Sequence, residues 1–213
     1  MRKCCLVMGT PRSGTSAIAG VLHNLGIPMG ERIDDPDCPD RWDFLDPNDW
    51  NPKGFFQDAA FFNLENAEFG GYAPASNWTA SNVFRDGLER LIAARCARGI
   101  DWGVKSNRLQ FYLAEFAAAC PYAIKVIVAE RDMATSQESW RARSRVDTEQ
   151  RGPDFIKAAR EQLRQCDSTE WLKVDFDKLV FDTASQVQRI AECVGRSVTP
   201  EAIQHIDQSL KRF

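Results

Sequence analysis

Near its amino terminus the chain runs from an apolar segment directly into a glycine-bracketed loop, which reads Leu6-Val7-Met8-Gly9-Thr10-Pro11-Arg12-Ser13-Gly14-Thr15-Ser16. Apolar residues then follow at helical spacing, at Ile18, Val21, Leu22 and Leu25. A strand, a loop and a helix in this order can bind phosphate, because the loop N–H groups and the positive end of the helix dipole meet at one point. The segment therefore predicts a phosphate-binding loop.

The cation of this loop is an arginine. A Walker A loop, GxxxxGK[ST], would place a lysine where this chain has Thr15, and the positive charge lies instead at Arg12. Arginine offers a planar fork of donors, whereas lysine is a point charge. The missing lysine argues against an ordinary P-loop kinase or ATPase.

The rest of the chain alternates between strand and helix patterns. After the first strand, at residues 3–9, further strands are expected at 102–105, 122–130 and 171–176. Helices are expected at residues 14–25, 59–69, 83–98, 109–119, 133–143, 153–166, 183–194 and 200–211. This alternation predicts one three-layer α/β domain of the P-loop type over residues 1–213, with a central parallel sheet flanked by helices. Ligands of such sheets bind beyond the carboxyl ends of the strands.

Composition excludes several classes of partner. The net charge of the 213 residues is only −3, which does not suggest nucleic-acid binding, and no apolar run is long enough to cross a membrane. The seven cysteines are scattered without a C-x-x-C pair, a pattern typical of reduced thiols in a cytoplasmic protein and not of a metal site. The apolar run at the amino terminus is short and leads into the loop, so we expect no signal peptide. The sequence leaves the oligomeric state open.

An irregular segment at about residues 28–58 interrupts the alternation. Between residues 31 and 58, nine acidic residues stand against three basic ones, with tryptophan and phenylalanine interleaved. Long irregular loops in compact domains are usually functional or mobile, so we interpret this one as a lid over an acceptor that is cationic or rich in hydroxyl groups. The alternative is a solvated acidic loop whose aromatic side chains pack on the sheet.

A second phosphate anchor is predicted after the strand at 122–130, where Arg131 follows directly and Ser139 comes eight residues later. Together with the first loop, of the form P-[KR]-S-G-T-[ST], this pair resembles the sulfotransferases that use 3′-phosphoadenosine 5′-phosphosulfate (PAPS). The resemblance implies that Arg131 and Ser139 hold the 3′-phosphate of PAPS. It assigns the 5′-phosphosulfate to the loop residues Pro11, Arg12, Ser13, Gly14, Thr15 and Ser16.

The resemblance also implies the reaction: transfer of a sulfuryl group from PAPS to a small-molecule or glycan acceptor, through a hydroxyl or an amine, with PAP (3′-phosphoadenosine 5′-phosphate) as product and without a metal. Lys105 follows a predicted strand, and we expect it to act with Arg12 on the sulfuryl group or the departing oxygen. The alternative for Lys105 is a solvated lysine at a strand end.

The general base is harder to identify. Family members carry a histidine in a K-[ST]-H motif, or a glutamate after a G-[FY]-[FW] motif, and this chain has Asn107 and Gln57 there. Asp58, beside Gln57, is the expected base. Two other functions stay open. One is a P-loop nucleotide kinase or ATPase, in which Glu130 or Asp132 would imitate a Walker B acid, and the other is a protein that binds PAPS or PAP without catalysis.

Overall fold

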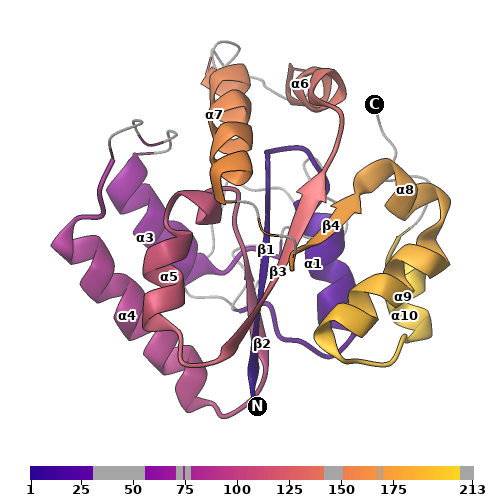
Figure 1. The fold of residues 1–213 in the computed structure, drawn as a ribbon, viewed down its shortest axis with the longest axis horizontal. Helices are drawn as coiled ribbons and strands as arrows, with labels where there is room; N and C mark the ends of the chain where they lie inside the picture. The colour runs from indigo at the N-terminus through magenta and orange to yellow at the C-terminus, as the bar shows by residue number, and fades with distance from the viewer. Residues whose placement is uncertain are drawn as a thin grey trace.

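The computed structural model describes residues 1–30, 56–70, 74, 78–141, 151–166, 168 and 170–206. Within them, four parallel strands form one sheet in the order β2-β1-β3-β4 (Figure 1). The strands are β1 (Lys3–Gly9), β2 (Trp102–Lys105), β3 (Ala123–Glu130) and β4 (Leu172–Asp175). The predicted α/β class with a central parallel sheet is confirmed.

Helices cover both faces of the sheet (Figure 1). The described helices are α1 (Thr15–Asn24), α3 (Ala59–Phe69), α4 (Asn82–Ala97), the 3₁₀ helix η1 (Leu109–Phe111), α5 (Leu113–Ala119), α6 (Met133–Arg141), α7 (Arg151–Cys166), α8 (Phe176–Phe181), α9 (Thr183–Val194) and α10 (Pro200–His205). One hydrophobic core joins the sheet to α1, α8, α9 and α10, and a second joins it to α3, α4, α5 and α7. Alternate side chains of β1 enter the two cores, since successive residues of a strand point to opposite faces.

The strand register brings the predicted site residues to one edge of the sheet. Val7 pairs with Lys105, and Gly9 pairs with Ala129. The loop after β1, the end of β2 and the residues that follow β3 therefore emerge together at the carboxyl edge. This is the edge at which parallel sheets bind ligands.

The structure differs from the sequence-based expectation at the end of β4. The strand was predicted to reach residue 176, but it stops at Asp175, and the short helix α8 begins at Phe176. The Asp175 side chain accepts a hydrogen bond from the Lys178 N–H at 2.9 Å, which makes Asp175 the N-cap of α8. A capping carboxylate stabilises the helix start and so ends the strand.

Three predictions lie partly outside the described residues. Most of the predicted lid at 28–58 falls on residues 31–55, and the end of the helix expected at 133–143 falls on residues 142–143. The helix expected at 200–211 is shorter than predicted, since α10 ends at His205 and its C-cap Ile206 has an extended backbone; the rest of that range, 207–211, is not described. The assignment of the whole chain to one domain depends on these parts as well and stays a prediction. Among the helices described, none has the length and apolar character needed to cross a membrane.

Candidate functional site

The loop between β1 and α1 has the backbone geometry of an anion-binding loop. The backbone N–H and the side-chain Oγ of Ser13 both donate to the carbonyl of Thr10, at 3.2 and 2.7 Å, which closes the turn. Gly14 is the N-cap of α1 and provides no side-chain cap. The first N–H groups of a helix have no intrahelical partner, so here they are available to an anion.

Two residues of this loop have left-handed backbone conformations. Arg12 has a φ of 68° and Gly14 a φ of 91°. A Cβ atom on Gly14 would lie 2.1 Å from Cδ2 of Phe176, the first residue of α8. Both the backbone conformation and the contact therefore require glycine at position 14.

The two predicted phosphate anchors meet in the structure. Nε of Arg12 donates a hydrogen bond to Oγ of Ser139 at 3.2 Å, across 127 positions of the chain. Ser139 lies on α6 and is 1% exposed, whereas Arg12 is half-buried. The loop after β1 and the helix after β3 therefore form one site.

Arg131, directly after β3, is held by an aromatic ring. Its guanidinium carbon lies 4.9 Å from the centroid of the Phe176 ring, a cation–π contact. Phe176 thus supports both Gly14 and Arg131, although the sequence analysis did not select it. The signal that could have found it is an aspartate followed by an aromatic residue at a strand end, which is weak on its own.

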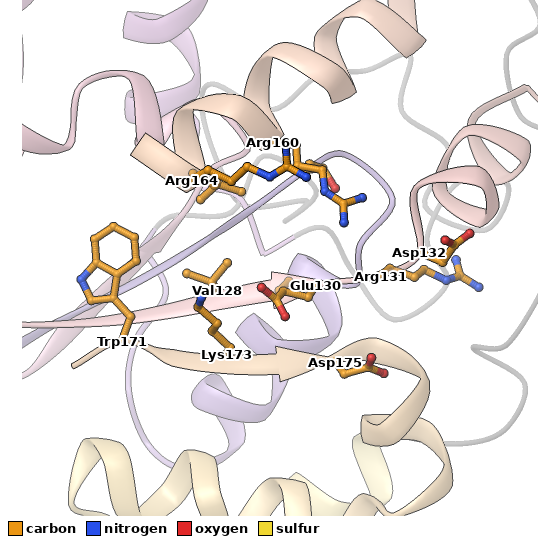
Figure 2. A pocket seen from close by; sticks show the side chains of 12 residues that line it. Val128, Glu130, Arg131, Asp132, Arg160, Arg164, Trp171, Lys173 and Asp175 are labelled. Carbon is orange, nitrogen blue, oxygen red and sulfur yellow. The ribbon is translucent and has the colours of Figure 1, made fainter. Parts of the chain in front are cut away.

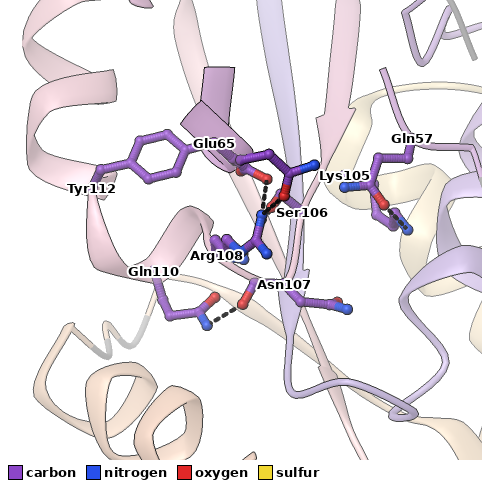
Figure 3. A network of polar contacts seen from close by, with 9 residues as sticks. Gln57, Glu65, Lys105, Ser106, Asn107, Arg108, Gln110 and Tyr112 are labelled. Atoms are coloured by element: carbon purple, nitrogen blue, oxygen red, sulfur yellow. Dashed lines mark hydrogen bonds and ion pairs between the residues drawn. The ribbon is translucent and has the colours of Figure 1, made fainter. Parts of the chain in front are cut away.

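Lys105, at the end of β2, lies in a polar cluster beside the loop (Figure 3). Its side chain is almost completely buried, and Nζ donates to Oε1 of Gln57 at 3.3 Å and approaches Oγ of Ser16 at 3.5 Å. Oγ1 of Thr15 donates to Oδ1 of Asn107 at 3.2 Å. The structure therefore brings Lys105 and the two amides that stand at the family's base positions against the start of α1.

Asp58 does not have the surroundings of a general base. It is 1% exposed, and its Oδ1 accepts hydrogen bonds from the N–H groups of Ala60 and Phe61 at 3.0 and 3.2 Å. Its Oδ2 lies 2.6 Å from a guanidinium nitrogen of Arg95, in a buried ion pair between α3 and α4. One carboxylate oxygen caps α3 and the other forms the ion pair. This geometry does not support the expected role of Asp58 as a base, and we propose a structural role for it.

A second buried carboxylate, Glu65 of α3, was not selected from the sequence. The Tyr112 hydroxyl donates to its Oε1 at 2.6 Å, and Nη1 of Arg108 lies 3.9 Å from its Oε2 (Figure 3). Burial raises the pKa of Glu65, against the hydrogen bonds from Ser106 and Tyr112 and the positive charges of Arg108 and Lys105. A carboxyl group in such surroundings is a candidate for a functional role.

A cavity of about 530 Å³ opens next to the loop, between β3, β4 and α7 (Figure 2). Arg131 and Trp171 lie at opposite ends of it, and Thr10 of the loop is also among its lining residues. Arg160 and Arg164 project from α7 above the strands. The volume is typical of sites for small molecules and cofactors. Among the residues described, no group of three or more histidine, cysteine or acidic side chains is arranged to hold a metal ion.

Comparison with known proteins identifies the family and the fold of this chain. A family model described as "Sulfotransferase family" matches residues 5–200. None of the curated protein sequences matches the chain. Among solved structures, the sulfotransferase domain of the olefin synthase from Synechococcus PCC 7002 is similar, with a TM-score of 0.58 and 14% identity over 95% of this chain and 76% of that one.

Two further solved structures have similar folds. Sulfotransferase STF9 from Mycobacterium avium has a TM-score of 0.58 and 15% identity, over 96% of this chain and 67% of that one. A sugar kinase from Janibacter sp. HTCC2649 has a TM-score of 0.50 and 13% identity, over 95% of this chain and 98% of that one. At these identities the structures establish the fold and not the reaction.

Proposed function

Because the chain belongs to the sulfotransferase family, we propose that it transfers a sulfuryl group from PAPS to a hydroxyl or amine acceptor. The observation that carries the proposal is the hydrogen bond between Arg12 and Ser139, with Arg131 at the end of the neighbouring strand. This contact joins a loop suited to one phosphate with a helix suited to another. A donor with phosphates at its 5′ and 3′ positions needs two such anchors.

The residues of the loop fit the 5′ end of the donor. The start of α1, which has no side-chain cap, supplies N–H groups, and the left-handed backbone of Gly14 leads the loop into the helix. Arg12 adds a charged fork of donors, and the hydroxyls of Thr15 and Ser16 lie at the same helix end. Pro11 and Ser13 complete the loop. This set would hold the 5′-phosphosulfate.

Arg131 and Ser139 would hold the 3′-phosphate. The guanidinium of Arg131 is oriented by Phe176, so that little side-chain entropy remains to be lost when it binds a phosphate. The cavity beside Arg131 and Thr10 has room for further parts of the donor or of an acceptor.

The chemistry requires in-line displacement at sulfur. The bond between the sulfuryl sulfur and the bridging oxygen of the 5′-phosphate breaks, a bond from sulfur to the acceptor atom forms, and PAP leaves with the bridging oxygen. We assign Lys105 and Arg12 to the negative charge that develops on that oxygen and on the sulfuryl group. The proton of the acceptor goes to a base that we leave unassigned, since Asp58 is engaged elsewhere.

Calorimetric titration with PAP, in parallel with ADP and with ATP plus Mg²⁺, tests the proposal. We expect PAP to bind tightly without magnesium and ADP to bind weakly, because only PAP carries the 3′-phosphate. Preference for ATP with Mg²⁺ would place the chain among the nucleotide kinases or ATPases. If PAP binds but ³⁵S-labelled PAPS transfers no label to any of a panel of hydroxyl and amine acceptors, the protein binds the nucleotide without catalysis.

A further inference from the structure

The segment that follows β2 is fixed by a buried network around Glu65. The hydroxyl of Ser106 accepts a hydrogen bond from the Arg108 N–H at 3.0 Å. The Arg108 guanidinium donates to Oδ1 of Asn66 at 2.8 Å and lies 3.9 Å from Glu65 (Figure 3). Lys105 is the last residue of β2 and directly precedes this segment. The position of its ammonium group therefore depends on contacts that converge on α3.

Charge balance gives Glu65 a second role beside these contacts. The side chains of Lys105 and Glu65 are almost completely buried, and that of Arg108 is 11% exposed. Buried cations need a nearby negative charge, because desolvation penalises them strongly. The positive charges of Arg108 and Lys105 both favour the ionised form of Glu65, and Nη1 of Arg108 lies 3.9 Å from its Oε2.

The ionisable groups described around this carboxyl come from several elements. Lys105 faces it from the end of β2, Arg108 from the segment after β2, and Tyr112 from the N-cap of α5. Asp58, at the start of α3, acts on Tyr112. Burial and then the charge of Glu65 raise the pKa of Tyr112 well above its usual value, so its hydroxyl keeps its proton and remains a donor to Glu65.

We propose that Glu65 is a positioning residue for Lys105: its carboxylate fixes the 105–108 segment through Ser106 and Arg108 and balances the charge of the two cations. The proposal rests on the proposed function only in so far as Lys105 acts on the sulfuryl group. Glu65 touches neither the loop nor α6 in the described contacts, so its effect on catalysis passes through Lys105.

Nuclear magnetic resonance of the ligand-free protein tests the charge coupling without any activity. The ¹³Cε resonance of Lys105, assigned with a Lys105→Arg variant, is followed over pH in protein labelled with ¹³C-lysine. In Glu65→Gln, which keeps the shape of the side chain, the titration midpoint of Lys105 should move by about one pH unit to lower pH, because a negative charge near the ammonium is removed. The matched control is Glu68→Gln on the same helix. The Glu68 carboxylate accepts hydrogen bonds from Ser81 and Trp78, so this variant should leave the Lys105 midpoint unchanged.

The wild-type protein provides a measurement that does not depend on a variant that folds. As pH falls, Glu65 should take up its proton at a pH above the usual glutamate range, and the Lys105 resonance should show a second inflection there. Absence of that inflection in the wild type, or an unchanged Lys105 midpoint in a folded Glu65→Gln variant, overturns the proposal. Neither result would bear on PAPS as the donor.

Turnover separates positioning from a purely structural role. With ³⁵S-labelled PAPS and water as acceptor, Glu65→Gln should lower kcat by about tenfold to a hundredfold, because Lys105 is misplaced. Its affinity for PAP should change by less than about twofold, since the described contacts of Glu65 do not include the phosphate anchors. In the wild type, kcat should fall at low pH as Glu65 takes up its proton, and this fall should be absent in Glu65→Gln. Equal losses of kcat and PAP affinity, with the fall at low pH kept, would refute positioning even if PAPS is the donor.

Discussion

Replacement of Arg131 with alanine gives the sharpest separation of the two phosphate anchors. In the free protein the guanidinium lies 4.9 Å from the Phe176 ring, a contact that contributes about 0.5–1 kcal/mol at an exposed site. Hydrogen bonds to a charged phosphate contribute more, about 1.5–3 kcal/mol. The variant should therefore stay folded and bind PAP about 10- to 150-fold more weakly.

The two nucleotides PAP and AMP make this prediction specific. AMP (adenosine 5′-monophosphate) lacks the 3′-phosphate, so its affinity should change by less than about twofold in the variant. Calorimetry gives both affinities, and urea unfolding gives the stability. The control is Arg85→Ala, which removes an exposed arginine of α4. If Arg131→Ala binds PAP as tightly as the wild type, or loses PAP and AMP to the same extent, Arg131 does not bind the 3′-phosphate.

Three further variants test the rest of the site. Arg12→Ala should weaken AMP and PAP alike, by about tenfold or more in calorimetry, because both carry the 5′-phosphate; a loss confined to PAP would contradict this. Gly14→Ala should lower Tm and abolish PAP binding, since its Cβ would lie 2.1 Å from Phe176 at a φ of 91°; an unchanged Tm would show that the loop differs from this description. Asp58→Asn should lower the free energy of unfolding in urea by about 3–5 kcal/mol, because it removes the carboxylate that is paired with the buried Arg95. The folded variant should still turn over PAPS, whereas full stability with no turnover would support Asp58 as the base.

The fold was largely predictable because its strongest signals are local. The apolar runs that became β1 and β3 are buried along most of their length, and a parallel sheet follows from strands that alternate with helices. Arg131 and Ser139 were predicted to act together from their fixed spacing after one strand, and this joint role stays a prediction. The contact of Ser139 with Arg12 was not, because it depends on how α6 packs beside a loop 127 positions earlier.

The surroundings of Asp58 have a physical cause that the sequence partly contained, although its role as a base stays an untested prediction. With a helix predicted at 59–69, Asp58 is the residue just before the first helical position, and aspartate is among the preferred N-caps. Local reasoning could therefore have assigned its carboxylate to the helix. The ion pair with Arg95, and the burial of Glu65 on the same helix, arise from tertiary packing and have no local signal.

The amides that replace the family's base residues have a consistent arrangement. Gln57 accepts a hydrogen bond from Lys105, and Asn107 accepts one from Thr15. In each pair the amide oxygen orients a donor that we assign to the sulfuryl group or the 5′-phosphosulfate, and neither amide can take up a proton at neutral pH. We therefore propose that Gln57 and Asn107, which stand where the resemblance places a base, orient donors in this chain. Catalysis under the proposed function then depends more on electrostatic stabilisation by Lys105 and Arg12, which is usually the largest single contribution in such transfers, than on a base at these two positions.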